Sequence, residues 1–175
     1  MVLSTSEILR EMKRGNIVVD PFDMSRINPN SVNLRLHNEL FMMREGLLDM
    51  KAECEYDRVV IPEEGFVLQP NRLYLGRTLE YTVTKKQVPL IEGRSSIGRM
   101  GIFIHATAGF GDVGFAGYWT LEISVIQPVK IYPFVEIAQI YYNTVKGKAM
   151  QYKGKYQNNR GIQTSGIHRE LSKSE

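Results

Sequence analysis

The sequence contains a single cysteine, Cys54, so no disulfide can form within the chain. A disulfide-stabilised secreted domain is therefore excluded, and the cytoplasm is the expected compartment. No apolar run is long enough to cross a bilayer, and the first residues lack the uninterrupted apolar stretch of a signal peptide. No contact with a membrane is expected.

The sequence also lacks a strong excess of charge of either sign. Its 22 Lys and Arg against 19 Asp and Glu leave a net charge of +3. This small charge weakly favours anionic small molecules and gives no reason to expect a nucleic-acid partner. The apolar content of 43% is ordinary for a soluble globular protein, and 175 residues suit one domain over 1–175.

Several catalytic signatures are missing. There is no His-x-Glu followed by Cys-x-x-Cys, which excludes a zinc deaminase, and there is no Walker loop, dinucleotide fingerprint or nucleophile elbow. The histidines His37, His105 and His168 occur in unrelated contexts. We interpret His105 as a packed or hydrogen-bonding structural residue, and expect neither zinc nor any metal ligand from side chains.

The residues that are present predict a short N-terminal helix followed by many strands. Ser4 and Glu7 have capping-box spacing, Ile8, Leu9 and Met12 share a helical face, and Gly15 is a stop signal. Short β-rich runs follow, separated by turn residues such as Pro29-Asn30 and Pro70-Asn71. These runs are 32–36, 40–43, 59–61, 66–68, 73–79, 88–91, 102–104, 120–126, 129–131 and 137–142. Many short strands indicate a sandwich, jelly roll or barrel.

The C-terminal segment, 145–175, has a different composition. It is rich in lysine and has little apolar periodicity. One interpretation is a solvated, mobile terminus. The alternative is a basic flap that folds over an anionic ligand.

The stretch from Arg94 to Arg99, Arg-Ser-Ser-Ile-Gly-Arg, is a candidate phosphate site. Arginine presents forked donors to phosphate, and serine hydroxyls and amides beside glycine add further donors. The same residues also occur in ordinary exposed turns, so the pattern alone leaves both readings open.

Two carboxylates are candidates for chemistry. Asp112 lies in a glycine-dense turn, where it can bond its own backbone or can accept a hydrogen bond from a sugar hydroxyl. Glu122 interrupts an apolar strand, on the same face as Thr120 and Ser124 by alternation. It is either an outward-facing residue of a half-exposed strand or a buried general base.

Taken together, these segments resemble the dCTP deaminase family, a branch of the trimeric dUTPase superfamily. EGRSSIGRMGIFIHATAGFGDVGFAGYWTLEI resembles the central signature of the family, KIYPFVEIAQI a strand ending in a substrate-reading glutamine, and KYQNNRG the C-terminal lid. The resemblance implies a mostly β, distorted jelly-roll or β-barrel fold and a homotrimer with active sites between subunits. It also implies that 145–175 is a flexible lid.

The resemblance further implies roles for individual residues. Glu122 would be the general base, and Ser95, Arg99, Ala108 and Asp112 would complete the catalytic set. The substrate-binding residues would be Arg94, Ser95, Ser96, Ile97, Gly98, Arg99, Asp112, Thr120, Leu121, Gln139, Lys155, Tyr156 and Asn159. Mg²⁺ would be held by the triphosphate and by water, with no side-chain ligand.

The pair Gly109-Phe110 bears on the product. Members of the family with Gly-Phe at this point both deaminate dCTP and hydrolyse the triphosphate, so the resemblance implies dUMP as product. The alternatives are a deaminase that releases dUTP, a dUTPase that does not deaminate, and a non-catalytic nucleotide-binding trimer. dCTP and dUTP are the expected ligands, with dTTP as an expected inhibitor.

Overall fold

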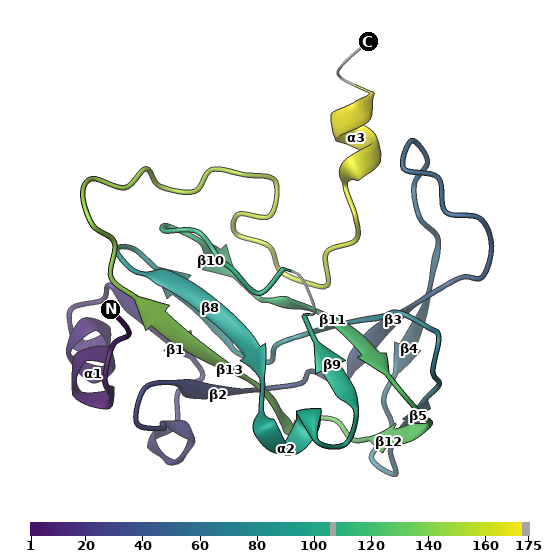
Figure 1. Cartoon of the computed structure of the whole chain (residues 1–175), viewed down its shortest axis with the longest axis horizontal. Helices are drawn as coiled ribbons and strands as arrows, with labels where there is room; N and C mark the ends of the chain where they lie inside the picture. The colour runs from purple at the N-terminus through teal and green to yellow at the C-terminus, as the bar shows by residue number, and fades with distance from the viewer. Residues whose placement is uncertain (106–107, 173–175) are drawn as a thin grey trace.

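The computed structural model describes residues 1–105 and 108–172, and in this part of the chain the β-rich runs form antiparallel strands (Figure 1). The strands are β1 (Ile17–Asp20), β2 (Val32–Arg35), β3 (Glu39–Met43), β4 (Tyr56–Val60), β5 (Phe66–Leu68), β6 (Tyr74–Arg77), β7 (Tyr81–Thr84), β8 (Val88–Gly93), β9 (Ile102–Ile104), β10 (Ala116–Gly117), β11 (Thr120–Val125), β12 (Val129–Ile131) and β13 (Glu136–Asn143). The helices are α1 (Thr5–Lys13), the 3₁₀ turn η1 (Met24–Arg26), α2 (Ser95–Gly98) and α3 (Ile167–Leu171). The prediction of a mostly β fold with a short N-terminal helix is confirmed.

The helix α1 forms where the sequence predicts it, but its start differs from the prediction. The Ser4 side chain does not cap the helix, because its hydroxyl lies 3.1 Å from that of Ser6, and Glu7 bonds Arg10 instead. The capping box is therefore not formed. The end agrees with the prediction, since Gly15 has a φ of +69°, a conformation that costs a glycine little.

The strands form four antiparallel sheets among the described residues. The largest has the order β4-β3-β6-β11-β9, and β2-β13-β8, β1-β7-β10 and β12-β5 are the others. These ladders do not close into a barrel, and their arrangement is that of the predicted jelly-roll type. In the large sheet β11 lies between β6 and β9, with Glu122 opposite Leu75 and Ile123 opposite Ile104.

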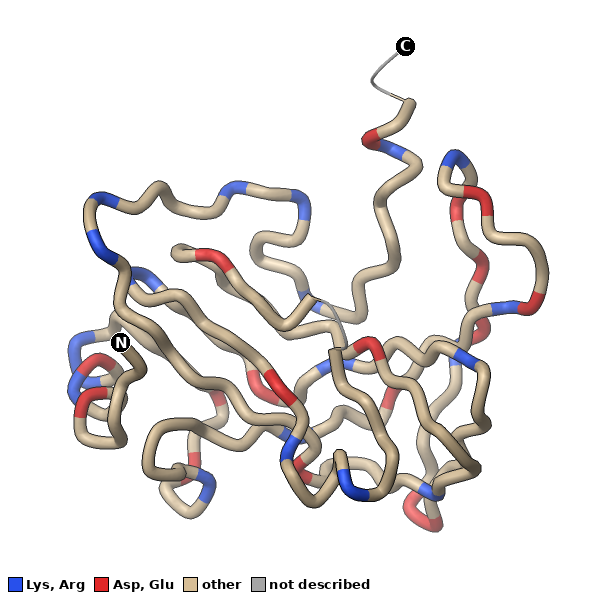
Figure 2. Tube along the Cα trace, viewed as in Figure 1, with Lys and Arg blue, Asp and Glu red and all other residues tan. Residues whose placement is uncertain are grey.

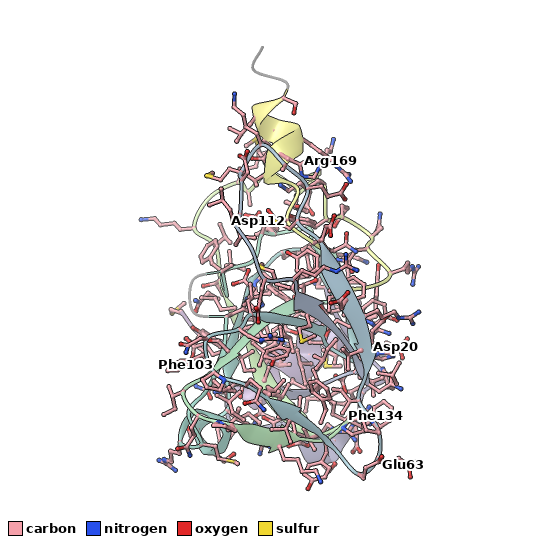
Figure 3. The ribbon with its side chains drawn as sticks, turned by 90° about the vertical axis from the view of Figure 1, so that its right-hand side faces the viewer. Asp20, Glu63, Phe103, Asp112, Phe134 and Arg169 are labelled. Atoms are coloured by element: carbon pink, nitrogen blue, oxygen red, sulfur yellow. The ribbon has the colours of Figure 1, made fainter. Side chains whose placement is uncertain are left out.

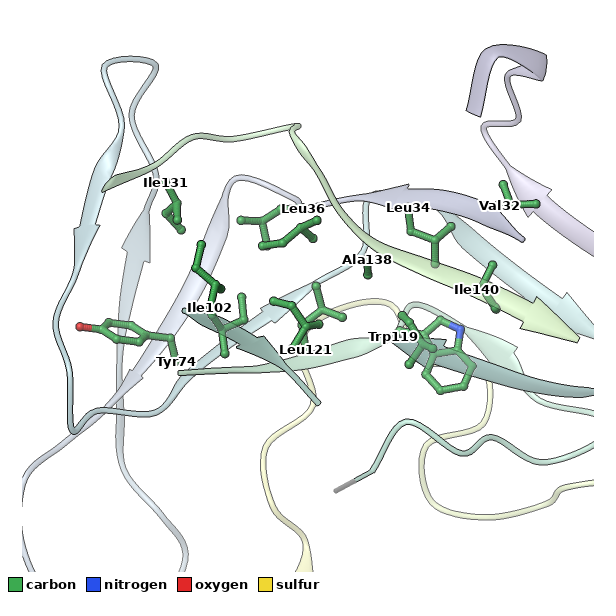
Figure 4. Close-up of a cluster of buried hydrophobic side chains, with 14 of the residues drawn as sticks. Val32, Leu34, Leu36, Tyr74, Ile102, Trp119, Leu121, Ile131, Ala138 and Ile140 are labelled. Atoms are coloured by element: carbon green, nitrogen blue, oxygen red, sulfur yellow. The ribbon is translucent and has the colours of Figure 1, made fainter. Parts of the chain in front are cut away.

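The hydrophobic core lies between the sheet that contains β13 and the sheet that contains β11 (Figure 4). Leu34, Ala138 and Ile140 face it from one sheet, and Leu121 and Ile102 face it from the other. All five are buried. Burial of such side chains gives about 1.5–3 kcal/mol for each large aliphatic residue, and this drives the two sheets together.

Three strands were not among the β-rich runs identified in the sequence: β1, β7 and β10. Strand β4 was predicted only in part, because it begins three residues before the predicted run 59–61. Its first residues, Tyr-Asp-Arg, are polar, so the hydrophobic pattern did not include them. It lies at the edge of the large sheet, where polar side chains face water. Hydrophobic pattern alone identifies such an edge strand poorly.

The C-terminal segment leaves β13 and follows the surface to α3, and Lys and Arg mark its first part (Figures 1 and 2). The last residues of the predicted lid, 173–175, lie outside the described residues. Within the described part, no helix combines the length and the apolar composition that a membrane crossing requires.

Trp119 joins several of these elements. It is 7% exposed, its backbone N–H donates to the Thr78 hydroxyl at 3.0 Å, and its indole N–H donates to the Thr82 hydroxyl at 3.0 Å. The Thr82 hydroxyl in turn donates to the Gly117 carbonyl at 3.3 Å. Trp119 therefore fixes the start of β11 against β6 and β7.

We expect Thr82→Val to lower the free energy of unfolding by about 1–3 kcal/mol, because a buried indole N–H loses its acceptor without any change in side-chain volume. Urea unfolding followed by tryptophan fluorescence measures this. Thr84→Val, on the same strand, is the matched control, since Thr84 makes none of the hydrogen bonds of Trp119. Equal stability of both variants would show that the indole bond contributes nothing.

Candidate active site

Glu122 lies on the polar face of β11. The strand alternates as predicted: Leu121, Ile123 and Val125 are buried, whereas Thr120 and Glu122 are half-buried on the other face. The side chain of Glu122 is 37% exposed. It is therefore neither sealed in the core nor freely solvated.

This polar face forms one wall of a cavity of about 600 Å³. Such a volume is within the range of small-molecule sites. The lining comes from four parts of the chain: the stretch around β11, the C-terminal segment, the hairpin between β3 and β4, and β6. Its residues include His105, Ala108, Phe110, Asp112, Phe115, Tyr118, Trp119, Thr120 and Glu122, then Tyr152, Tyr156, Asn159 and Gln163, and also Met43, Leu48, Met50, Tyr56 and Leu75.

His105 is a titratable residue in contact with Glu122. Its side chain is 5% exposed, and its Nδ1 lies 3.7 Å from Oε2 of Glu122. The ring packs edge-on against Trp119, with 6.4 Å between the ring centroids. His105 lowers the pKa of the Glu122 carboxyl below its ordinary value, although partial burial acts in the opposite direction.

His105 is packed, as the sequence predicts, and its contact with Glu122 is a feature that the sequence did not predict. The residue follows directly after β9, and β9 pairs with β11 so that Ile104 is opposite Ile123. Knowledge of that pairing would have placed His105 beside Glu122. The hydrophobic patterns of the two runs do not show which residues of β9 and β11 lie opposite each other.

Asp112 lines the same cavity from its exposed rim, and Figure 3 shows it toward the end of the molecule that carries α3. Its backbone carbonyl accepts from Phe115 N at 3.2 Å, so the glycine-dense turn forms as expected. Among the described residues its carboxylate has no hydrogen-bond or ion-pair partner. The acceptor oxygens of Asp112 are thus free to receive a ligand hydroxyl.

Gly109 and Phe110 have different surroundings: Phe110 faces the cavity, and Gly109 contacts the backbone of β8. Phe110 is 68% exposed and lines the cavity. A Cβ at Gly109 would lie 2.4 Å from the carbonyl oxygen of Ile91, and the Gly109 carbonyl accepts from Ile91 N at 2.8 Å. Glycine is required at this position because the chain closely approaches the backbone of β8. This requirement is independent of any space that glycine leaves for a ligand.

The predicted phosphate residues do not line this cavity. Arg94 precedes α2, and Ser95, Ser96, Gly98 and Arg99 are exposed on or beside that short helix. The Arg94 guanidinium pairs with Glu136 at 3.1 Å. Figure 1 shows α2 on the side of the sheets away from the C-terminal segment. Ile97 is half-buried on α2, and Gln139, on β13, accepts from the Ser31 hydroxyl at 3.2 Å.

The remaining predicted residues divide between the cavity and other surroundings. Tyr156 and Asn159 line the cavity, but the Asn159 amide is hydrogen bonded to the backbone of Tyr118. Lys155 pairs with Glu170 and lies over the ring of Tyr156 at 4.9 Å. The Leu121 side chain is fully buried in the core, so any contact of Leu121 with a ligand must come from its backbone.

A single chain therefore presents two separate sets of predicted site residues. One set, with Ala108, Asp112, Thr120 and Glu122, offers two carboxyl groups and a hydroxyl in a cavity. The other, around α2, offers arginine and serine donors that suit phosphate.

A family model described as dCTP deaminase-like matches residues 2–145. The chain belongs to the dCTP deaminase-like family. The protein named "dCTP deaminase, dUMP-forming" from Clostridium acetobutylicum is 57% identical to this chain over 172 residues. The match covers 98% of this chain and 99% of the relative. The protein of that name in Cytophaga hutchinsonii is 54% identical over 174 residues, covering 99% of this chain and 100% of the relative.

A solved structure shares the fold. The crystal structure of 2′-deoxycytidine 5′-triphosphate deaminase from Agrobacterium tumefaciens matches with a TM-score of 0.65 at 18% identity, over 82% of this chain. The match spans 48% of the length of that protein. At this identity the likeness concerns the architecture alone.

We expect His105→Asn to raise the pKa of Glu122. Asparagine tolerates the φ of +55° at this position but is too short to favour the carboxylate as the imidazole does. NMR titration of the glutamate carboxyl carbons in nucleotide-free protein measures the change. The control is His37→Asn, since His37 packs on Phe134 instead. A pKa that is identical in wild type and His105→Asn would contradict the role of His105.

Proposed function

We propose that this chain converts dCTP to dUMP, by hydrolytic deamination followed by hydrolysis of the triphosphate in the same site. The observation that carries the proposal is the Glu122 carboxylate, which faces a cavity of nucleoside size with its pKa lowered by His105. Relatives more than half identical over nearly the whole chain bear the name "dCTP deaminase, dUMP-forming". A carboxylate that stays ionised is what a general base needs.

In the first step, water adds to C4 of the cytosine ring while Glu122 accepts its proton. Glu122 then passes that proton to the ring nitrogen N3. The proton of the new C4 hydroxyl moves to the amino group, which leaves as ammonia, so that a carbonyl remains at C4. The Ala108 carbonyl orients the water, the Thr120 hydroxyl bonds the base, and Asp112 accepts the deoxyribose hydroxyl. Ser95 and Arg99 stabilise the developing charge.

In the second step, dUTP stays bound and a second water attacks the α-phosphorus. The bond to the bridging oxygen breaks, and diphosphate leaves with dUMP remaining. Of the pair Gly109-Phe110, the exposed ring of Phe110 lines the cavity. A protein that releases dUTP after the first step is the alternative.

The complete site is proposed to contain residues from two copies of the chain. The cavity carries the base and sugar groups, whereas Arg94, Ser95, Ser96 and Arg99 lie outside it. A homotrimer in which α2 of one copy meets the cavity of the next brings both sets to one nucleotide, as in a closed ring of heterologous contacts. Gln139 and Lys155 are proposed to complete the contacts with substrate.

Mg²⁺ is proposed to enter with the nucleotide. Among the described residues no group of three or more His, Cys, Asp or Glu side chains could hold a metal ion. The ion is proposed to be held by triphosphate oxygens and water, where it would neutralise phosphate charge. dTTP, which has the same sugar and phosphates, is proposed to compete for the site, and the reaction is proposed to take place in the cytoplasm.

We expect Glu122→Gln to lower the rate of ammonia release from dCTP by about 10²–10⁴-fold, because glutamine has the size of glutamate but cannot accept the proton of water. Chromatographic separation of dCTP, dUTP, dUMP and ammonia over time, with Mg²⁺ present, measures both steps. The wild type should form dUMP and diphosphate in equal amounts. Accumulation of dUTP without diphosphate would show a deaminase only, and no turnover would refute an enzyme acting on dCTP.

A mixing experiment tests the shared site. Glu122→Gln and Arg99→Ala homotrimers should each be inactive, whereas subunits mixed one to one should recover about a quarter of wild-type activity, because some sites then combine an intact Glu122 with an intact Arg99 from another copy. Mixtures of either variant with itself are the control. No recovery in proven mixed trimers would mean that both residues act within one chain.

A further inference from the structure

The C-terminal segment is fastened to the edge of the 114–120 stretch by amide side chains. Gln157 Oε1 accepts from Ala116 N at 2.9 Å, and its Nε2 donates to the Gly114 carbonyl at 2.7 Å. The backbone of Asn158 adds a bond to the Ala116 carbonyl at 2.7 Å. Gln157 thus makes the two bonds that a peptide unit of a neighbouring strand would make.

Asn159 repeats this arrangement two residues further along. Its Oδ1 accepts from Tyr118 N at 3.1 Å, and its Nδ2 donates to the Tyr118 carbonyl at 3.1 Å. The opposite edge of the same stretch pairs with β7, where Ala116 lies opposite Val83. Residues 114–118 are therefore bonded on both edges, although no strand is formed on the C-terminal side.

Glycines make this close approach possible. A Cβ at Gly117 would lie 2.5 Å from Nδ2 of Asn159 and 3.0 Å from Cζ of Phe115. A Cβ at Gly114, which has a φ of +91°, would lie 2.5 Å from Oε1 of Gln151 and 3.0 Å from the backbone nitrogen of Tyr152. The Gly-Phe-Ala-Gly sequence is thus a docking surface for the segment that contains Gln157 and Asn159.

We infer that Gln157 and Asn159 are positioning residues, which together form an amide latch that holds the C-terminal segment against residues 114–120 before nucleotide binds. Asn159 then acts through the backbone of Tyr118 and does not read the nucleotide through its amide. The docking part of this inference is independent of the activity. Its catalytic part rests on the proposed function.

The latch also leads the chain to a hydrogen bond at the wall of the cavity. Beyond Asn159 the segment continues so that Gln163 N donates to the Thr120 hydroxyl at 2.9 Å. A threonine hydroxyl has one proton, and an acceptor site used by Gln163 leaves that proton available. Thr120 therefore keeps its donor proton and one acceptor lone pair for a ligand, and the proton can pair with an acceptor such as a pyrimidine carbonyl oxygen.

Isosteric substitutions test the latch. Asn159→Asp and Gln157→Glu each replace a donor NH₂ by an oxygen that faces a backbone carbonyl, so the bond is lost and repulsion replaces it. Asn158→Asp is the matched control, because it introduces the same charge next door on an exposed side chain, and aspartate tolerates its φ of +58°. Hydrogen exchange of nucleotide-free protein, read on peptides covering 114–120, is the measurement.

We expect exchange at residues 116 and 118 to become about tenfold faster in Asn159→Asp and Gln157→Glu, and to stay unchanged in Asn158→Asp. Gly117→Ala should act in the same way, since the added methyl displaces the Asn159 amide. Its effect should be smaller when Asn159 is already alanine. In turnover of dCTP, the latch variants should lose kcat/KM, while Asn158→Asp keeps it.

Two results would overturn the inference. Unchanged exchange at 114–120 in Asn159→Asp, together with loss of nucleotide binding, would show that Asn159 contacts the nucleotide directly. Equal effects of Gly117→Ala with and without Asn159 would show that the methyl acts elsewhere. If wild-type protein does not turn over dCTP, the proposed function fails, but the exchange result still decides whether the latch exists.

Discussion

The pairing of β11 with β6 on one side and β9 on the other is the constraint on which the site depends. Because side chains alternate along a strand, one face of β11 gives Leu121, Ile123 and Val125 to the core while the other presents Thr120 and Glu122 to the cavity. The apolar face anchors the polar one. A shift of register by one residue would bury the carboxylate and expose the core side chains, at a cost of several kcal/mol.

Glu122 shows how a neighbouring side chain offsets the effect of burial on the pKa of a carboxyl group. Burial alone would raise the pKa of Glu122, and the neighbouring His105 lowers it. His105 is held in place by the start of β11 itself, because its ring packs against Trp119, which is bonded to Thr78 and Thr82. The pKa of the proposed base therefore depends on packing several residues away from it.

The sequence predicts the parts of this arrangement that follow from local pattern. Alternation places Thr120 and Glu122 on one face, and the helix at the N-terminus is visible from its apolar spacing. Long-range pairing is not visible in this way, so the contact of His105 with Glu122 and the strand β10 were missed. Closeness in sequence also misleads: Arg99 and Asp112 are separated by few residues, yet β9 carries the chain away from α2 before Asp112 reaches the cavity.

The glycine-dense stretch combines two duties that the sequence pattern does not separate. Its glycines allow backbone contact: Gly109 approaches β8, Gly111 approaches Trp119 and Pro89, and Gly117 approaches Asn159. The stretch is thus packed between β8 and the C-terminal segment, and its polar residue Asp112 is left at the rim of the cavity. Since a Cβ at these glycines would push one of the two neighbours away, the glycines fix where Asp112 stands relative to Glu122. Glycine is needed at these positions for steric reasons, and the proposed chemistry is carried out by the carboxylates that the glycines position.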